Sequence, residues 1–177
     1  MSETSKLHKK SSPDSARLYI IACSTSKFKQ LRAKQQLSDE SGDTIEQLAI
    51  SAGHKIAGRK LISDSKPMLQ KTTRTALSIR DVDAVIITGG TGLSSTDVTF
   101  EAISPLLDQE IPGFGELFRK ISFDEIGSAA MVSRAFAGMI KRRAIFCLPG
   151  SPNAVRTAME KLILPELGHI IGLAQGR

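Results

Sequence analysis

Residues 82–101, VDAVIITGGTGLSSTDVTFE, contain the signals that decide the fold. The segment AVIIT at 84–88 is a continuous apolar run, which is typical of a strand buried on both faces. Three glycines follow within the five residues TGGTG, and then come a polar loop and two acidic residues at an expected helix start. This order predicts a strand of a parallel sheet with a ligand-binding turn at its carboxyl end.

Working outward, the same alternation of apolar runs and amphipathic segments continues along the chain. Further buried strands are predicted at 17–23, 55–62 and 144–148. Helices are predicted at 43–52, from 65, at about 97–104, at 115–125 and from 151 to near the C-terminus. Buried strands separated by amphipathic helices predict an α/β fold, with three α/β/α layers and a mostly parallel sheet.

Three segments do not fit this alternation. Residues 1–16 are polar and rich in Ser and Lys, so we expect a disordered tail before a single domain at 17–177. Residues 24–42, STSKFKQLRAKQQLSDESG, read as a long charged loop that could include one helical turn. A loop of this length within a compact domain is usually functional or disordered. Residues 126–143 give no clear pattern.

The composition is that of an ordinary globular protein, with 177 residues, 41% hydrophobic and 24% charged. No apolar run approaches the roughly 18 residues of a membrane span, and the N-terminus lacks the apolar region of a signal peptide. Cys23 and Cys147 lie in apolar runs, so both are expected to be buried, reduced thiols. We therefore expect a cytoplasmic protein without membrane association.

The net charge of +6 permits nucleic-acid binding but does not require it. Aromatic residues are only 5% of the chain and tryptophan is absent, so platforms for base stacking are hard to build. A small anionic substrate explains the charge equally well. A basic nucleic-acid binder remains an alternative, but a small-molecule substrate is favoured and no nucleic-acid partner is expected.

A second glycine turn, LPGSP at 148–152, resembles the first in its place between a strand and a helix. Glycines allow positive φ and let an anion approach backbone N–H groups closely. The candidate phosphate-binding residues are Thr88, Gly89, Gly90, Thr91, Gly92, Pro149, Gly150, Ser151 and Pro152. No Gly-Lys-Ser/Thr follows, and Ser95 breaks the dinucleotide-binding pattern. The alternative is that both are ordinary strand-to-helix turns. For the second turn alone, this explanation is as good as phosphate binding.

Three carboxylates are expected near these turns. Asp97 and Glu101 are four residues apart and would share one helix face, and Asp64 follows the predicted strand at 55–62. Magnesium prefers one or two carboxylates together with phosphate oxygens, so Asp97 beside a phosphate suits Mg²⁺. The alternatives are solvated acids at a helix start, and a helix cap at Asp64. The three histidines are expected to have structural or solvated roles only.

The chain resembles the MoaB/Mog family of molybdenum-cofactor biosynthesis, to which the gephyrin G domain is related. The residues that carry the resemblance are ITGGTGLSSTDVTFEAISPLLDQEIPGFGELFR at 87–119, SRAFAG at 133–138 and LPGSPNAV at 148–155. The similarity extends over about residues 17–170, and IPGFGELFR is closest to the MoaB branch. The first strand departs from the family, because ACSTS at 22–26 stands where a Val-Ser-Asp-like segment is usual.

The resemblance implies a molybdopterin-binding fold that assembles as a trimer or a dimer of trimers. It also implies Mg²⁺-dependent adenylylation of molybdopterin by ATP, which yields adenylylated molybdopterin and pyrophosphate. By the same resemblance, Asp64 and Asp97 are catalytic and hold the metal, and Ser133 contacts the pterin. Arg134 is a candidate for neutralising phosphate charge, and Glu101 is a weaker candidate. A non-catalytic molybdopterin carrier or scaffold in the same pathway is the alternative.

Overall fold

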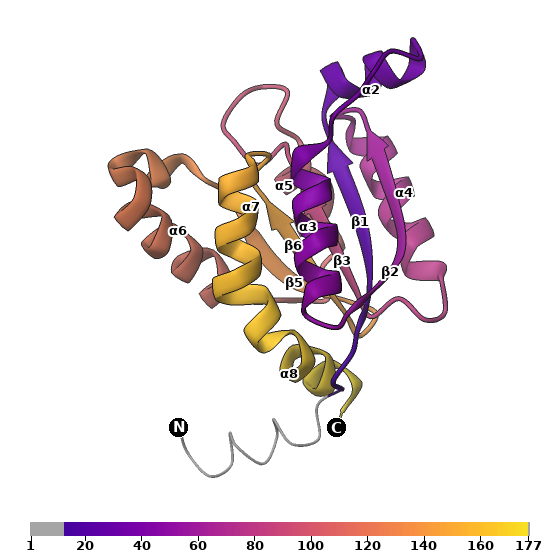
Figure 1. Cartoon of the computed structure of the whole chain (residues 1–177). Helices are drawn as coiled ribbons and strands as arrows, with labels where there is room; N and C mark the ends of the chain where they lie inside the picture. Colours follow the sequence, from indigo (N-terminus) through magenta and orange to yellow (C-terminus); the bar gives the residue numbers. More distant parts are fainter. Residues whose placement is uncertain (1–12, 177) are drawn as a thin grey trace.

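The computed structural model describes residues 13–176, and its centre is a six-stranded sheet (Figure 1). The strand order is β2-β1-β3-β6-β5-β4. The strands are β1 Arg17–Cys23, β2 Lys55–Ile62, β3 Ala84–Thr88, β4 Gln109–Glu110, β5 Phe136–Ile140 and β6 Arg143–Leu148. The strands predicted at 17–23, 55–62 and 84–88 have the same bounds as β1, β2 and β3. Strand β6 starts one residue earlier than predicted.

The sheet is parallel from β2 through β6, and its other edge is antiparallel. Strand β5 joins β6 through a hairpin in which Lys141 and Arg142 have φ of 49° and 62°. Strands β4 and β5 were not predicted, since β4 has only two residues and β5 lies in the segment 126–143 that gives no clear pattern. The predicted mostly parallel sheet is confirmed.

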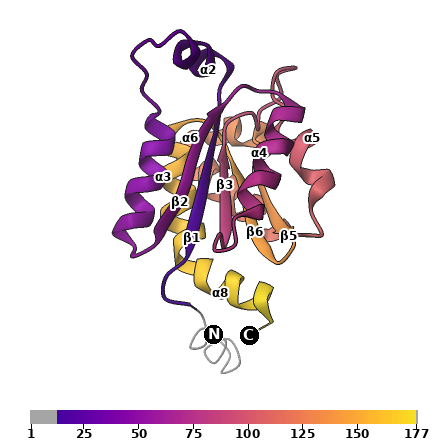
Figure 2. The ribbon, with the colours of Figure 1, turned by 90° about the vertical axis from the view of Figure 1, so that its right-hand side faces the viewer.

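Helices cover both faces of the sheet and make the three predicted layers (Figure 2). Helices α3, α6, α7 and α8 pack on one face, and α4 and α5 pack on the other. The helices are α2 Thr25–Arg32, α3 Glu40–Ser51, α4 Lys66–Ser78, α5 Thr99–Ile103, α6 Pro112–Ile126, α7 Pro152–Ala158 and α8 Leu164–Gln175. Two 3₁₀ turns lie at Ser104–Leu106 and Gly127–Val132, and a π turn lies at Met159–Ile163.

The alternation of side chains along β3 and β6 divides the core into two clusters. Ile86 and Phe146 face α3, α6 and α7, whereas Ile87 and Cys147 face α4 and α5. All residues of β3 are buried, which explains why this strand shows no polar alternation. The two central strands are thus fixed from both sides, and so are the turns that leave them.

The charged segment 24–42 is more regular than its sequence indicated. Helix α2 occupies eight of its residues, is capped by Ser24 and buries none of its side chains. Helix α3 starts at Glu40 rather than Asp43, because the Asp39 carboxylate accepts a hydrogen bond from the Gly42 N–H. The prediction of a long loop is therefore wrong at both ends of the segment.

Two helix predictions also need correction. Asp97 precedes α5 and is not part of it, so Asp97 and Glu101 do not share a helix face. The C-terminal helix is interrupted by the π turn at Met159–Ile163, and Pro165 stands in the first turn of α8. The start of α7 is as predicted, with Ser151 at the N-cap and Pro152 in the first turn.

At the N-terminal side, described structure begins within the segment that was expected to be a tail. Ser15 donates to the Gly53 carbonyl at 2.8 Å, and Ala16 is buried. Residues 1–12 lie outside the described part of the chain. Among residues 13–176, no helix is long and apolar enough to cross a membrane.

Candidate functional site

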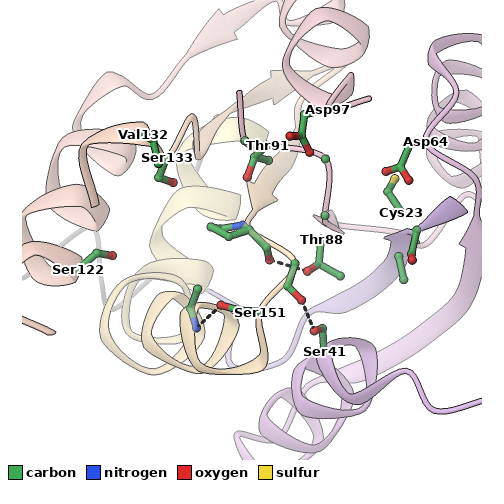
Figure 3. Close-up of a pocket in the computed structure, with 18 of the residues that line it drawn as sticks. Cys23, Ser41, Asp64, Thr88, Thr91, Asp97, Ser122, Val132, Ser133 and Ser151 are labelled. Atoms are coloured by element: carbon green, nitrogen blue, oxygen red, sulfur yellow. Dashed lines mark hydrogen bonds between the residues drawn. The ribbon is translucent and has the colours of Figure 1, made fainter. Parts of the chain in front are cut away.

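A cavity of about 520 Å³ lies at the carboxyl edge of the sheet (Figure 3). Strand order reverses between β1 and β3, since β2 lies on one side of this pair and β6 on the other. Such a reversal is the usual place for a ligand in a parallel sheet, and this volume is typical of small-molecule sites. The cavity wall includes the ends of β1 and β3, the turn after β6 and part of α6.

The first glycine turn, residues 88–92, lines the cavity throughout. Gly89 and Gly90 have φ of 98° and 67°, values that side chains other than glycine rarely adopt. A Cβ on Gly89 would lie 2.2 Å from the Cys23 carbonyl oxygen, so no larger residue fits. The Gly89 N–H donates to Leu148 O at 3.0 Å, which joins this turn to the end of β6.

The second turn, residues 148–152, lies beside the first because Thr88 and Leu148 are register partners in β3 and β6. The Thr88 hydroxyl donates to Pro149 O at 2.8 Å, and the Ser41 hydroxyl donates to Gly150 O at 2.7 Å. Figure 3 shows both bonds. Pro149, Gly150 and Ser151 line the cavity, as predicted, whereas Pro152 is not among its lining residues.

Asp64 follows β2 and lines the cavity next to the first turn. Its Oδ2 accepts from the Thr25 N–H at 2.7 Å and from the Thr25 hydroxyl at 2.9 Å. The same hydroxyl oxygen accepts from the Asp64 N–H at 3.1 Å and lies 2.9 Å from Ser63 Oγ. Thr25 thus makes three hydrogen bonds with Asp64, and the Asp64 Oδ1 is left toward Gly90.

Asp97 lies on the other side of the glycine turn and also lines the cavity. Its Oδ2 accepts from the Ser94 N–H at 2.9 Å, and the Asp97 N–H donates to Ser94 O at the same distance. These two bonds form a tight turn that holds Asp97 outside α5. Figure 3 shows Asp64 and Asp97 at the same end of the cavity, as their proposed pairing requires.

The residues present fit a magnesium ion that is shared with phosphate. Asp64 and Asp97 each use Oδ2 for a protein hydrogen bond, and within residues 13–176 neither Oδ1 has a protein donor. The described chain contains no cluster of three or more His, Cys, Asp or Glu that could hold a metal by itself. Two carboxylates that leave the other coordination positions open match Mg²⁺, because this ion usually keeps several waters and also binds phosphate oxygens.

Arg134 and Glu101 do not line this cavity but a smaller adjoining pocket that also includes Asp97, so ligand contact by these two residues stays a prediction. Arg134 donates through Nε to Gly92 O at 2.8 Å and through Nη2 to Asp97 O at 3.1 Å. Its guanidinium also pairs with Glu101, and this hydrogen bond lowers the pKa of the Glu101 carboxyl. The pair fixes the loop that carries Asp97.

The opposite wall comes from α6, the 3₁₀ turn after it and α7. Ser133, the candidate for pterin contact, lines this wall, and Ser122 is a polar neighbour that was not predicted (Figure 3). The remaining lining residues of this wall are Phe118, Ile126, Ala129, Ala130, Val132 and Ala154. The cavity therefore has an end with carboxylates and glycine turns, and a mostly apolar end with two hydroxyl groups.

Four further lining residues were missed, and all come from the segment 24–42 that was read as a loop. Ser24 caps α2, Lys27 belongs to α2, Asp39 caps α3, and Ser41 lies in the first turn of α3. The motifs quoted for the family resemblance include no position in α2 or α3. Their place in the site follows from tertiary structure.

Among the thiols and histidines of residues 13–176, only Cys23 lines the cavity. Cys23 lines the cavity, but burial raises the pKa of its thiol to about 12. Cys147 is fully buried, and burial raises the pKa of its thiol too, so the prediction of two buried free cysteines is confirmed. His54 Nδ1 accepts from the Ala16 N–H, and burial lowers the pKa of this ring. His8 lies outside the described residues.

Comparison with known proteins identifies the family to which this chain belongs. Residues 19–169 match the family described as a probable molybdopterin binding domain, which is most of the chain. The chain belongs to the molybdopterin-binding MoaB/Mog family. The family match thus extends from within β1 to the middle of α8 and includes every predicted site residue.

Relatives of known name agree with this assignment. Molybdenum cofactor biosynthesis protein B of Bacillus cereus is 46% identical over 92% of this chain and 93% of its own length. A probable molybdopterin adenylyltransferase of Methanocaldococcus jannaschii is 37% identical over 86% of this chain and 90% of its own. The crystal structure of the tungsten cofactor synthesizing protein MoaB from Pyrococcus furiosus superposes with a TM-score of 0.81, at 35% identity, over 92% of this chain and 99% of that one.

Proposed function

We propose that this protein adenylylates molybdopterin with ATP in a Mg²⁺-dependent reaction, giving adenylylated molybdopterin and pyrophosphate. The observation that carries the proposal is the grouping of Asp64, Asp97 and both glycine turns around one cavity at the switch point of the sheet. The M. jannaschii relative, named as a probable molybdopterin adenylyltransferase, supports the same reaction.

In this reaction an oxygen of the molybdopterin phosphate attacks the α-phosphorus of ATP, and the bond from that phosphorus to the β-phosphate oxygen breaks. Phosphoryl and nucleotidyl transfers of this type need positioning and charge neutralisation more than covalent catalysis. That need agrees with a cavity whose only cysteine has a thiol pKa raised to about 12. A side-chain nucleophile is not required.

The two halves of the cavity suit the two parts of the task. Asp64 and Asp97 would hold Mg²⁺, which offsets phosphate charge when it is bound. Thr25 and the Ser94 N–H keep these carboxylates oriented, so little reorganisation is needed on binding. The turns at 88–92 and 149–151 present backbone to phosphate oxygens, and the apolar end with Ser122 and Ser133 suits the pterin ring.

We also propose self-association, as the family resemblance implies. Outside the cavity, α6 and the 3₁₀ turn after it expose three large apolar side chains, which are Leu117, Phe123 and Met131. Met131 is 78% exposed, and a group of such residues on a monomer usually marks a contact surface. A trimer or dimer of trimers that buries this surface is the expected assembly.

The decisive experiment is incubation with molybdopterin, ATP and Mg²⁺, followed by measurement of adenylylated product and pyrophosphate. Asp64→Asn and Asp97→Asn should each lower turnover by about 100-fold or more, as loss of a preorganised charge does. Asp81→Asn is the matched control, because Asp81 is exposed and pairs with Arg17 at the opposite edge of the sheet. Unchanged product formation by Asp97→Asn would exclude the metal role.

A carrier or scaffold that binds molybdopterin without turnover is the second candidate. It rests on the same apolar end of the cavity, which needs no metal to bind a pterin. It predicts that molybdopterin is retained on gel filtration while no pyrophosphate is released with ATP and Mg²⁺. Pyrophosphate release at a rate dependent on molybdopterin would reject it.

A further inference from the structure

The charges around the cavity do not match the ligands that the proposed function assigns to it. Asp39, Asp64 and Asp97 all line the cavity, and each brings a carboxylate. The triphosphate of ATP and the phosphate of molybdopterin would add further negative charge. Among the described residues that line the cavity, Lys27 is the only lysine or arginine.

Two arginines near the cavity are committed to structural contacts. The Arg134 guanidinium binds Gly92 O, Asp97 O and Glu101 behind the turn. Arg59 binds Asp39, Asp43 and Glu46, and its contact with Asp39 Oδ2 is 2.7 Å long. Neither arginine lines the cavity, so neither is placed to meet a phosphate there.

Lys27 differs from these arginines, because its ion-pair partner Asp39 has other hydrogen-bond donors. Its Nζ lies 3.7 Å from Asp39 Oδ1, a longer contact than that between Arg59 and the same carboxylate. Asp39 also accepts from the Gly42 N–H, so the carboxylate stays paired when Lys27 moves away. Leaving Asp39 therefore costs Lys27 little, because the contact is long, the lysine side chain is 33% exposed and the carboxylate keeps Arg59 and the Gly42 N–H as partners.

Helix α2, which carries Lys27, also leaves this side chain free to change its rotamer. Helix α2 follows β1 directly, lies above the carboxyl edge of the sheet in Figure 1, and buries no side chain. Its start is held by backbone bonding, since the Phe28 N–H donates to Ser24 O at 2.9 Å. A fixed start with an unburied body lets a lysine in the first turn change rotamer without loss of core packing.

We propose that Lys27 is the phosphate-binding cation of this site. On ligand binding its ammonium group leaves Asp39 and binds phosphate oxygens held by the turn at 88–92. The inference rests on the proposed function and deepens it, because it replaces Arg134 with Lys27 as the residue that neutralises phosphate charge. The ligand chemistry is a phosphate group, supplied by ATP or by molybdopterin.

The test measures binding of ATP with Mg²⁺ by isothermal titration calorimetry on the full chain. Lys27→Ala should weaken binding about tenfold, as loss of one hydrogen bond to a charged group does. Lys27→Arg should restore most of the affinity. Lys29→Ala is the matched control on the same helix, because Lys29 is exposed and does not line the cavity, and it should change affinity by less than about twofold.

The source of the phosphate is resolved with further ligands. If Lys27 binds the β- or γ-phosphate, Lys27→Ala weakens ATP and pyrophosphate binding but leaves AMP binding unchanged. If it binds the pterin phosphate, ATP binding is unchanged and the KM for molybdopterin rises about tenfold. Melting temperatures of all variants confirm that folding is intact.

Two failures can be told apart. If Lys27→Ala binds ATP, pyrophosphate and molybdopterin like the original chain, or if Lys29→Ala loses as much affinity, the inference about Lys27 is wrong while the proposed reaction stands. If the original chain binds neither ATP nor molybdopterin, the proposed function and the inference are both rejected.

Discussion

The two glycine turns look alike in the sequence but differ in how strictly they require glycine. In the first turn, Gly89 and Gly90 have positive φ, and added Cβ atoms would lie 2.2 Å from Cys23 O and 2.6 Å from Thr99 Oγ1. In the second turn, Gly150 has a φ outside the left-handed region, and a Cβ there would lie 3.4 Å from its nearest neighbour, Gly89 Cα. The first turn is fixed by sterics, whereas the second has room.

The difference follows from what surrounds each turn. The first turn passes between the ends of β1 and β6 and is bonded to both Leu148 and Thr99. The second turn lies outside it and is held by the hydroxyls of Thr88 and Ser41. Sequence similarity between two loops therefore does not establish equal roles, and substitutions in the two turns can measure the difference.

The largest effect is expected for Gly89→Ala. The added Cβ must displace the Cys23 backbone at a φ of 98°, so the free energy of unfolding should fall by about 2–4 kcal/mol. Urea denaturation measures the change. Iodoacetamide at pH 8 gives a second readout, because the Cys23 thiol with a pKa of about 12 is almost wholly protonated there and should react only when the site opens.

Gly113→Ala is the control for that experiment, since an added Cβ at Gly113 would have no neighbour within 4 Å. It should leave stability unchanged or slightly higher, as Ala favours a helix more than Gly does. Equal stability of the Gly89 and Gly113 variants would show that the first turn is not sterically constrained.

Gly90→Ala should have a smaller effect on stability and a clear one on ligand binding. Its Cβ would crowd Thr99 Oγ1 and lie 3.3 Å from Asp64 Oδ1, the atom facing the expected metal position. We expect a loss of about 1–3 kcal/mol in unfolding free energy and at least about tenfold weaker ATP binding with Mg²⁺. Calorimetry with and without Mg²⁺ separates the two, and a loss independent of Mg²⁺ would contradict the Asp64 assignment.

Thr88→Val tests the bond that joins the turns. The hydroxyl donates to Pro149 O at 2.8 Å and is buried, so its removal should cost about 1 kcal/mol of stability. Thr88→Ser keeps the hydroxyl and is the control. If both variants lose equal stability in thermal denaturation, the methyl packing and not the hydrogen bond holds the turns together.

The smallest effect is expected for Gly150→Ala. With a normal φ and ordinary contact distances, the change in unfolding free energy should stay within about 0.5 kcal/mol. Turnover should be close to that of the original chain. A loss comparable to that of Gly89→Ala would mean that the second turn needs close approach of a ligand to its backbone.

The parts of the fold that sequence predicts well are those set by local pattern. The apolar runs of β1, β2 and β3 predict their bounds, and Ser151 with Pro152 predicts the start of α7. Both aspartates and both turns line one cavity because carboxyl ends of parallel strands share an edge. The remaining features depend on long-range contacts.

Helix α2 escapes prediction because it buries no side chain and so shows no apolar face. Asp97 lies outside α5 because its carboxylate accepts from the Ser94 N–H, a local choice that competes with helix formation. Arg134 follows directly after Ser133, yet its side chain turns to Gly92 and Glu101, on segments more than 30 residues away in sequence. Side-chain direction of this kind has no signal in residue type or spacing.

The central position of β3 and β6 has a consequence for hydrogen–deuterium exchange. Every residue of β3 is buried, and the amides next to the glycine turns are bonded to a neighbouring central strand. These amides should exchange only through the largest unfolding events, while those of α2 should exchange through local opening. The site is then bordered by slowly exchanging amides at the ends of the central strands and by rapidly exchanging amides in α2. Ligand binding should slow exchange chiefly in α2.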